Sequence, residues 1–308
     1  MIHDTVVVLG YGSQGRSIAL NLRDSGFNVV VGLRKKSTSM PKARRDGFPA
    51  APFNEAVKQA GTIIVALPDD CHQSVFEKIP RGRLNRSTPL VFLHGSTIHF
   101  GLVTPPKEAP VLLLAPHGPG LAVRANYLNK TPFSAFYAVH QGPKKQGYEL
   151  LVRLAKGIGI GRGHLIKTTF ADEAVGDLFG EQAVLCGGLA RLLKFGFETL
   201  VEAGLPPQNA YLEVAHQIDL IVDLIKRHGL AGMFDRISPL ARYGSAIHGP
   251  KVVSSEVKAE MKEVYDIIAS GRFIRDGMRA GLKVSKKQMA ELTSPPFDRQ
   301  VKRFNKGR

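Results

Sequence analysis

Three glycines near the start of the chain have the spacing of a dinucleotide-binding turn. Gly10-Tyr11-Gly12-Ser13-Gln14-Gly15 fits G-x-G-x-x-G and directly follows an apolar, β-branched run. Between a strand and a helix, the first glycine permits a tight turn, the second lets backbone approach a pyrophosphate, and the third lets helix pack on strand. The N–H groups that open the helix then face the phosphates. We predict that these six residues bind a dinucleotide; the alternative is an ordinary glycine-rich turn.

The end of the next apolar run indicates which dinucleotide. Phe27–Leu33 is followed by Arg34-Lys35-Lys36-Ser37-Thr38-Ser39, without Asp or Glu. A site for NAD usually has a carboxylate here that binds the ribose hydroxyls, whereas basic and hydroxyl side chains suit a 2′-phosphate. We therefore predict NADPH, with Arg34, Ser37 and Ser39 as candidate contacts to that phosphate. The alternative is a solvated basic loop.

Two carboxylates four residues apart, Asp177 and Glu181, lie in a segment with helical periodicity. On a helix they share one face. Without Cys or clustered His beside them, they suit a hard cation such as Mg²⁺ or Mn²⁺. Glu213 and Gln217 repeat the spacing in the next helical segment, with an amide in place of one carboxylate. By residue type alone, a solvated acidic face is the commoner explanation of such a pair.

The elements that must position these residues change in kind along the chain. Strand-like runs cover Val6–Gly10, Phe27–Leu33, Thr62–Leu67, Leu90–Leu93, Val111–Ala115 and Phe133–Val139, with a helical pattern over Ser13–Asp24. Their alternation is typical of a doubly wound parallel α/β sheet. Helical patterns cover Asp172–Leu205, interrupted at Gly187-Gly188, then Ala210–Arg227 and Val252–Ala269. We predict a Rossmann-type domain over 1–169 and an all-α domain over 170–308.

Length and composition exclude several classes of protein. The 308 residues are 44% hydrophobic and 22% charged, a balance typical of globular chains. No apolar run approaches the ~18 residues of a membrane span, and the start lacks a signal-peptide pattern. Cys71 and Cys186 are too few for a disulfide scaffold or a four-ligand zinc site. We therefore expect a soluble, cytoplasmic protein that needs no membrane.

Several of these motifs together carry a resemblance. The matching stretches are Gly10–Gly15, Val30–Lys35, His94-Gly95, Ile98–Gly101, Gly118–Gly120, Asp177–Gly188, Gly196–Gly204 and Ile221–Ile225. On these residues the chain resembles the class I (short-form) ketol-acid reductoisomerases over nearly its whole length. The string DLFGEQAVLCGG at Asp177–Gly188 is its longest and most specific part.

The resemblance implies an activity and an assembly. The family uses NADPH and Mg²⁺ to move an alkyl group within a 2-aceto-2-hydroxy acid and then reduces the product to a 2,3-dihydroxy acid, in branched-chain amino-acid synthesis. It also implies a Rossmann domain followed by a knotted helical domain. A homodimer is expected, because the helical domains of two chains intertwine to build the family's active site.

Several site residues can be carried over from the family pattern. Asp177, Glu181 and Glu213 match three of its four metal ligands, and Gln217 stands at the fourth position. An amide oxygen can coordinate a cation but brings no charge. Two further positions match the family. His94 matches its active-site histidine, and Ser238 matches the serine that holds the substrate carboxylate. By residue type alone, His94 would be a satisfied loop histidine and Ser238 a turn residue before a proline.

A second departure accompanies Gln217. The family has a catalytic lysine where this chain has His117, and a neutral imidazole lacks the fixed charge and three donors of an ammonium group. The site thus loses one anion and one cation, and its formal charge is unchanged. This pair of changes predicts weaker binding of at least one Mg²⁺ and impaired alkyl migration, with hydride transfer less affected.

Three functions therefore remain in competition. The first is a working ketol-acid reductoisomerase, and the second is a family paralogue that reduces a 2-keto acid or an imine without migration. The third is a non-catalytic protein that binds NADPH or nucleic acid through its basic surface. The net charge of +16 is concentrated in residues 1–169, with 22 basic against 9 acidic side chains. Since this is the part expected to hold a phosphorylated dinucleotide, the charge favours an anionic small molecule over nucleic acid.

Overall fold

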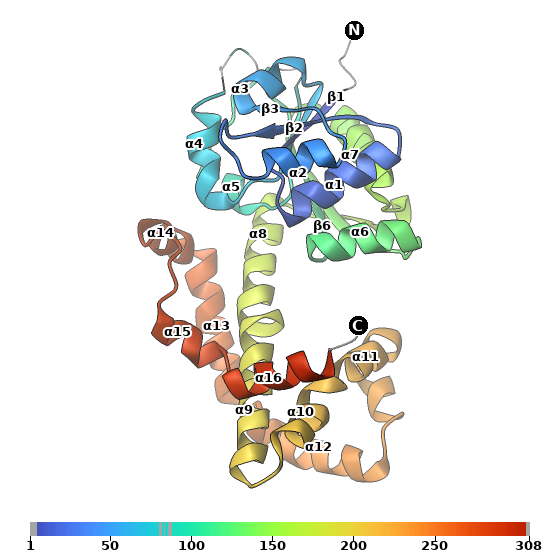
Figure 1. Ribbon diagram of the computed structural model, residues 1–308, viewed down its shortest axis with the longest axis vertical. Coiled ribbons are helices and arrows are strands. Elements are labelled where there is room, and N and C mark those ends of the chain that lie inside the picture. Colours follow the sequence, from blue (N-terminus) through green and yellow to red (C-terminus); the bar gives the residue numbers. More distant parts are fainter. Residues whose placement is uncertain (1–4, 80–81, 83, 86–87, 306–308) are drawn as a thin grey trace. The chain divides into compact units, whose positions relative to one another are not determined.

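The computed structural model describes residues 5–79, 82, 84–85 and 88–305 and is drawn in Figure 1. It divides into two compact units, residues 1–176 and 177–308. The division falls inside helix α8 (Phe170–Phe179), whose first residue is where the sequence pattern places the boundary.

The first unit is built on one eight-stranded sheet in the order β3-β2-β1-β4-β5-β6-β7-β8. Its strands are β1 (Thr5–Leu9), β2 (Asn28–Leu33), β3 (Ala50–Pro52), β4 (Thr62–Val65), β5 (Leu90–Phe92), β6 (Val111–Pro116), β7 (Ala135–Gln141) and β8 (Leu165–Lys167). The order of the first six is that of dinucleotide-binding folds, in which ligands lie beyond the carboxyl ends of the strands. The predicted Rossmann-type class is confirmed.

The sheet differs from the prediction in three strands. β7 runs antiparallel to β6, with Pro116 opposite Ala135. An apolar run carries no information about strand direction, so this reversal could not be read from the sequence. β3 and β8 were not predicted. Each has only three residues, as β5 does, but β5 (LVF) is a wholly apolar, buried run, whereas β3 (AAP) and β8 (LIK) are partly exposed and lack that signal.

Helices cover both faces of this sheet, as Figure 1 shows. The main helices of the unit are α1 (Ser13–Asp24), α2 (Met40–Arg45), α3 (Phe53–Ala56), α4 (His72–Phe76), α5 (Ser96–His99), α6 (Gly120–Asn129) and α7 (Lys144–Ile158). Val6 and Val8 of β1 belong to one core cluster with α1, α6 and α7, whereas Val7 and Leu9 belong to the cluster on the other face. Both faces of β1 are thus buried, which explains its uninterrupted apolar run.

The second unit is helical throughout its described residues. It contains α9 (Gly187–Glu202), α10 (Pro207–Tyr211), α11 (Ile218–Phe234), α12 (Pro239–Val252), α13 (Ser255–Ala269), α14 (Arg272–Arg279), α15 (Lys286–Leu292) and α16 (Pro295–Phe304). Two π-helical segments, η5 (Gly180–Leu185) and η6 (Leu212–His216), precede α9 and α11. None of the described helices is long and apolar enough to cross a membrane.

Packing within the second unit leaves much apolar surface open. A small core forms around Phe197 and Tyr211, with ring centroids of both 5.4 Å from that of Phe297. The helical pattern over Ala210–Arg227 predicts an apolar face that includes Leu220 and Ile221 and needs burial, but in the single chain these two residues of α11 are 62% and 38% exposed. The helix is present as the pattern predicts, but the described residues of the single chain do not cover that face.

Candidate active site

The glycine-rich turn links β1 to α1 and distinguishes its three glycines. Gly10 has φ of +99°, and a Cβ there would lie 2.2 Å from the carbonyl oxygen of Ala66. A Cβ on Gly15 would lie 2.6 Å from the carbonyl oxygen of Gly10. No atom lies within 4 Å of the Cβ position of Gly12, so this glycine is not required by the chain's own packing. The open space fits a ligand that approaches the backbone.

The start of α1 has the features of an anion-binding helix N-terminus. Gly12 is its N-cap and makes no side-chain capping bond, and the first turn contains no acidic residue. The first N–H groups of a helix lack partners within the helix, and its dipole favours negative charge there. A phosphate group would therefore be stabilised at this end of α1.

A second loop packs directly against this turn. Gln14 Nε2 donates a hydrogen bond of 2.8 Å to the carbonyl oxygen of Gly118. A Cβ on Gly120, the first residue of α6, would lie 2.4 Å from the backbone of Ser13, so only glycine lets α6 approach so closely. Gln14 Oε1 is buried and has no hydrogen-bond partner among the described residues. Such an orphaned acceptor fits a donor group on a bound ligand.

The predicted phosphate contacts lie in one turn after β2. Ser37 N donates to the carbonyl oxygen of Arg34 (2.9 Å), and Ser39 N donates to Ser37 Oγ (3.2 Å). Arg34 is exposed, and both serines are half-buried. The backbone therefore brings these three residues together with the arginine side chain open to solvent, where a 2′-phosphate could reach it.

Asp46, at the end of α2, is a residue that the sequence did not single out. Its carboxylate accepts hydrogen bonds of 2.7 Å from Tyr11 Oη and from Arg16 Nε. The Arg16 guanidinium lowers the pKa of Asp46 to about 2. Burial, followed by the bond to Asp46, raises the pKa of Tyr11. Asp46 is the only acid between residues 34 and 46, and it joins this basic segment to the glycine-rich turn.

His94 follows β5 and is held by two side chains. Its Nδ1 lies 2.9 Å from Glu173 Oε2, and its Nε2 lies 2.9 Å from Ser96 Oγ. Glu173, in α8, is 4% exposed and also accepts a hydrogen bond of 2.5 Å from Gly95 N. A Cβ on Gly95 would lie 2.3 Å from the carbonyl oxygen of Phe170, so glycine permits this approach of α8.

Sequence reasoning missed Glu173, although a signal was present. Glu173, Asp177 and Glu181 follow one another at intervals of four residues, which is one carboxylate per helical turn. The buried first carboxylate binds His94, so α8 connects the loop after β5 to the segment with the metal candidates.

His117 follows β6, directly before the loop that packs on the glycine-rich turn. Its backbone N donates to the carbonyl oxygen of Ser134 (2.9 Å), and its ring meets the edge of Phe136 with centroids 4.4 Å apart. The residue itself is exposed. Because β1, β5 and β6 are parallel, the loops that carry Gly12, His94 and His117 all lie beyond the same edge of the sheet.

The four metal candidates are associated with the two π-helical segments. Asp177 lies in the last turn of α8 and Glu181 in η5, while Glu213 lies in η6 and Gln217 directly follows it. All four residues are exposed. In the described part of the chain, the carboxylates of Asp177, Glu181 and Glu213 do not form one group of ligand atoms. Insertions of this kind in helices are frequent at functional sites.

The π-helical geometry also explains the glycine pair at the start of α9. A Cβ on Gly187 would lie 2.1 Å from the carbonyl oxygen of Gln182, and one on Gly188 would lie 2.1 Å from that of Ala183. Each close carbonyl is five residues earlier, as the wider turn requires. The sequence pattern placed the helix interruption at these glycines, and the structure shows that the irregular segment is η5, just before them.

The side-chain amide of Gln217 is hydrogen-bonded to the backbone of the preceding turn. Its Nε2 donates to the carbonyl oxygens of Leu212 (3.4 Å) and Glu213 (3.3 Å). A carboxylate could not donate either bond. Ser238, the candidate substrate contact, is the N-cap of α12, and its Oγ accepts a hydrogen bond of 3.2 Å from Ala241 N. Ser238 is exposed, so its hydroxyl also remains open to a ligand.

Comparisons with known proteins place the two parts of the chain in one family. Residues 1–164 match the family described as acetohydroxy acid isomeroreductase, NADPH-binding domain, and residues 170–305 match the ketol-acid reductoisomerase C-terminal domain. An NADH-preferring ketol-acid reductoisomerase from an uncultured archean is 34% identical, with a TM-score of 0.92 over 99% of this chain and 95% of that one.

More distant structures share the fold alone. A semialdehyde dehydrogenase NAD-binding protein from Cupriavidus necator is 18% identical, with a TM-score of 0.64 over 86% of this chain and 99% of that one. The pyrroline carboxylate reductase of Plasmodium falciparum is 16% identical, with a TM-score of 0.56 over 87% and 99%.

Proposed function

Since the chain belongs to the ketol-acid reductoisomerase family and is an oxidoreductase of that type, we propose that it converts 2-aceto-2-hydroxy acids to 2,3-dihydroxy acids with NADPH and Mg²⁺. This reaction would serve the synthesis of valine, leucine and isoleucine in the cytoplasm. The observation that carries the proposal is the junction of the glycine-rich turn with the loop after His117, beside the orphaned oxygen of Gln14. It unites a dinucleotide cradle with a candidate catalytic loop.

The preference for NADPH rests on the turn after β2. Arg34 is exposed there, and Ser37 and Ser39 lie beside it. The nearest acid in that segment, Asp46, is bonded to Arg16 and Tyr11 and so is not available to a ribose hydroxyl. The solved relative from the uncultured archean is NADH-preferring, so the preference must be measured for this chain. We expect a KM for NADPH at least ~10-fold below that for NADH, since charge-assisted phosphate contacts are strong.

The carboxylates fit a hard cation by their chemistry. Mg²⁺, when bound, would polarise the ketone of the substrate and make its hydroxyl more acidic. Asp177, Glu181 and Glu213 would supply negative charge, and Gln217 would supply at most its neutral Oε1, because its Nε2 is bonded to backbone. The chain's own contribution to cation binding is therefore one charge smaller than in a site with four carboxylates.

We assign proton handling to the loop after β5. Glu173 and Ser96 bond to the two nitrogens of His94 and fix the orientation of its ring. His94 could then hold or pass on a proton at Nε2. His117 would donate a hydrogen bond to a substrate oxygen, and Ser238 would bind the substrate carboxylate. Glu173 is a positioning residue in this scheme.

We also propose a homodimer. α11 and α12 expose Leu220, Leu230, Leu240 and Tyr243, which are 62–80% exposed. Surfaces of this kind mark association sites. Since the described residues of one chain do not bring Asp177, Glu181 and Glu213 into one group, a second copy would bring Glu213 to the other two carboxylates.

A two-substrate assay tests the proposed reaction. Purified protein with NADPH and Mg²⁺ is given 2-acetolactate or, separately, 3-hydroxy-3-methyl-2-oxobutanoate, the already rearranged keto acid. We expect NADPH oxidation with both substrates and a dihydroxy acid as product. Oxidation with the rearranged acid alone would show a reductase without migration, and no oxidation with either would overturn the proposal.

A further inference from the structure

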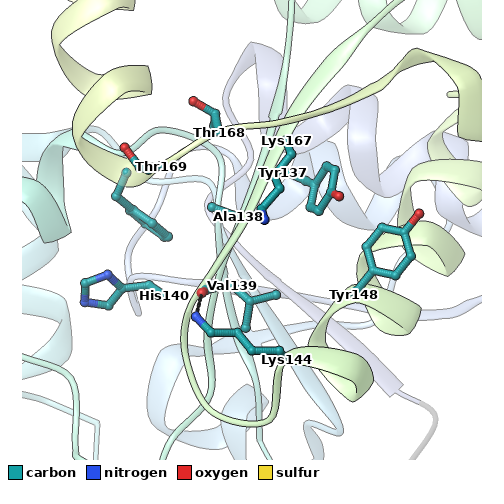
Figure 2. Close-up of a pocket in the computed structure, with 10 residues that line it drawn as sticks. Tyr137, Ala138, Val139, His140, Lys144, Tyr148, Lys167, Thr168 and Thr169 are labelled. Carbon is teal, nitrogen blue, oxygen red and sulfur yellow. Dashed lines mark hydrogen bonds between the residues drawn. The ribbon is translucent and has the colours of Figure 1, made fainter.

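A cavity of about 560 Å³ opens in the first unit on the far side of the sheet from the glycine-rich turn. Figure 2 shows its lining, which comes from β7, α7 and the segment that joins β8 to α8. In the sheet, β4, β5 and β6 lie between β1 and this region. The cavity is therefore separate from the dinucleotide turn, although Phe170 of its lining also packs on Gly95, beside His94. Its volume lies in the usual range for small-molecule pockets.

The cavity exists because β8 is shorter than its neighbour. β8 pairs with β7 only from Ala135 to Tyr137, and Thr168 N adds one more bond to the carbonyl oxygen of Tyr137. The chain then turns into α8, and the ring of Phe170 meets that of His140 with centroids 5.3 Å apart. The last residues of β7 thus lose their neighbouring strand, and a hollow remains beside them.

The polar lining is cationic or hydrogen-bond donating. Lys144 and Lys167 both line the cavity, together with His140 and the hydroxyl of Thr168. The Thr169 hydroxyl, also in the lining, already donates to Asp172 Oδ2 (2.8 Å) and is therefore not available as a donor to a ligand. The ammonium group of Lys144 donates to the carbonyl oxygen of Val139, as the dashed line in Figure 2 shows. The ten described lining residues include no Asp or Glu, so neither lysine has a carboxylate partner among them. Such a lining favours an anion.

One wall of the cavity is aromatic. The rings of Tyr137 and Tyr148 lie on the same side in Figure 2, with centroids 5.2 Å apart and planes tilted by 43°. Outside this wall, the Arg162 guanidinium lies 5.8 Å from the Tyr148 ring, and its Nε donates to Tyr148 Oη at 3.4 Å. Aromatic faces of this kind offer stacking area to a planar ligand.

We propose that this cavity binds a small anion with an aromatic ring, such as a phosphorylated or carboxylated aromatic compound. The acid group lies between Lys144 and Lys167, and the ring rests against Tyr137 and Tyr148. This proposal does not rest on the reaction proposed above. It also gives a use to basic residues of the first unit that lie away from the dinucleotide turn.

The test uses the full-length protein saturated with NADPH, so that the dinucleotide site is filled. Phenyl phosphate and benzoate are titrated at low ionic strength and followed by ligand-observed NMR, with inorganic phosphate and phenol as comparisons. We expect saturable binding of phenyl phosphate or benzoate that is at least ~10-fold tighter than that of inorganic phosphate or phenol, because only the first two use both walls.

Three substitutions in the lining and one control outside it localise the binding. Lys144→Gln and Lys167→Gln should each weaken it about 10-fold, the size of one lost charge-assisted contact. Lys145→Gln, which removes the same charge from the next residue of α7 outside the cavity lining, should change it by less than ~2-fold. Tyr148→Leu, which keeps an apolar side chain, should weaken the two aromatic acids but not inorganic phosphate.

Three results would overturn the proposal. They are no saturable binding of either aromatic acid, equal effects of Lys144→Gln and Lys145→Gln, and binding of inorganic phosphate as tight as that of phenyl phosphate. The last would mean an adventitious ion only. Melting curves of each variant ensure that a lost signal reflects the cavity and not unfolding.

Discussion

Two hydrogen bonds at the His94 ring decide how this side chain is presented. Glu173 and Ser96 occupy its two nitrogens, and the carboxylate is almost fully buried. Glu173→Gln removes the negative charge but keeps the shape, so the ring loses its orienting partner. We expect kcat to fall about 10- to 100-fold, as for other supporting partners of functional histidines, with little change in the KM for NADPH.

A neighbouring acid gives the control for that measurement. Asp172 precedes Glu173 in α8, is exposed and binds Thr169 instead of His94. Asp172→Asn should leave kcat within about 2-fold of the wild-type value, because exposed charges away from the site have small effects. Equal losses in both variants would show that charge near the start of α8, and not the bond to His94, is what matters.

His72 makes stability depend on pH. It is buried, and its Nε2 lies 2.9 Å from the carbonyl oxygen of Leu67 while Nδ1 contacts Thr97 Oγ1. Burial lowers its pKa below the ordinary value of 6.5. Protonation therefore favours the unfolded chain, and this stability is present above about pH 6.5 and is lost as the pH falls.

We expect the melting temperature to fall from pH 7.5 to pH 5.5 by more in the wild type than in His72→Asn. At pH 7.5 the variant should itself be less stable by about 1–3 kcal/mol, the usual loss for a buried hydrogen-bonded group. Thermal unfolding followed by circular dichroism measures both quantities. An identical pH dependence in the two proteins would contradict the assignment to His72.

At the scale of elements, the glycines of the glycine-rich turn have different tasks: Gly15 is needed for folding, whereas Gly12 is expected to be needed only for binding the dinucleotide. The Cβ of Gly12→Ala would meet no atom of the chain, whereas that of Gly15→Ala would collide with the Gly10 carbonyl. Gly12→Ala should fold with an unchanged melting temperature and bind NADPH at least ~10-fold more weakly, because its Cβ occupies the space of the pyrophosphate. Gly15→Ala should lower the melting temperature as well.

Calorimetric titration with NADPH and a melting curve for each variant check this. Gly163→Ala is a suitable control, since its Cβ also meets nothing and Gly163 lies outside the turn. Normal NADPH affinity in Gly12→Ala would show that the cofactor does not approach the backbone there.

The metal candidates lie in or beside the π-helical segments, so a substitution there tests how the chain's charge affects cation affinity. In Gln217→Glu a fourth carboxylate joins Asp177, Glu181 and Glu213, and two weak backbone bonds are lost. Because affinity for hard cations rises with ligand charge, we expect Mn²⁺ to bind about 10-fold more tightly to at least one site. Electron paramagnetic resonance of free Mn²⁺ measures this without an activity assay. Gln182→Glu, which adds the same charge in η5 at a residue that is not a metal candidate, should have a smaller effect. Equal effects of the two substitutions would show that Mn²⁺ responds only to the net charge of the region.

At the scale of the whole molecule, the second unit has helices but little core. Its large exposed apolar residues predict a dimer of twice the 33.5 kDa chain mass by light scattering. Leu230→Glu, on α11, should weaken dimerisation at least ~100-fold, since a buried unpaired carboxylate is costly. Leu128→Glu is a matched control, because this leucine is 59% exposed on α6 in the first unit. A monomeric wild type would overturn the prediction.

Local signals in the sequence were sufficient for the α/β class, the helical second half and the dinucleotide turn. These features depend on periodicity and on glycines at fixed spacing, and both act between residues that are close in the chain. The same holds for the resemblance, because Asp177–Gly188 is one continuous string. The basic turn after β2 was likewise legible, since the absence of an acid there is a property of six neighbouring residues.

Tertiary structure alone decided which distant residues meet. Glu173 binds His94 across 79 positions, and Gln14 binds Gly118 across 104. The reversal of β7 and the short β8, which together leave the cavity beside Tyr148, depend on strand pairing. The burial of Leu220 also depends on tertiary structure. The amphipathic pattern of its helix shows that this residue needs a packing partner but not which one. Periodicity specifies what an element must bury, whereas only the packed chain specifies what it is buried against.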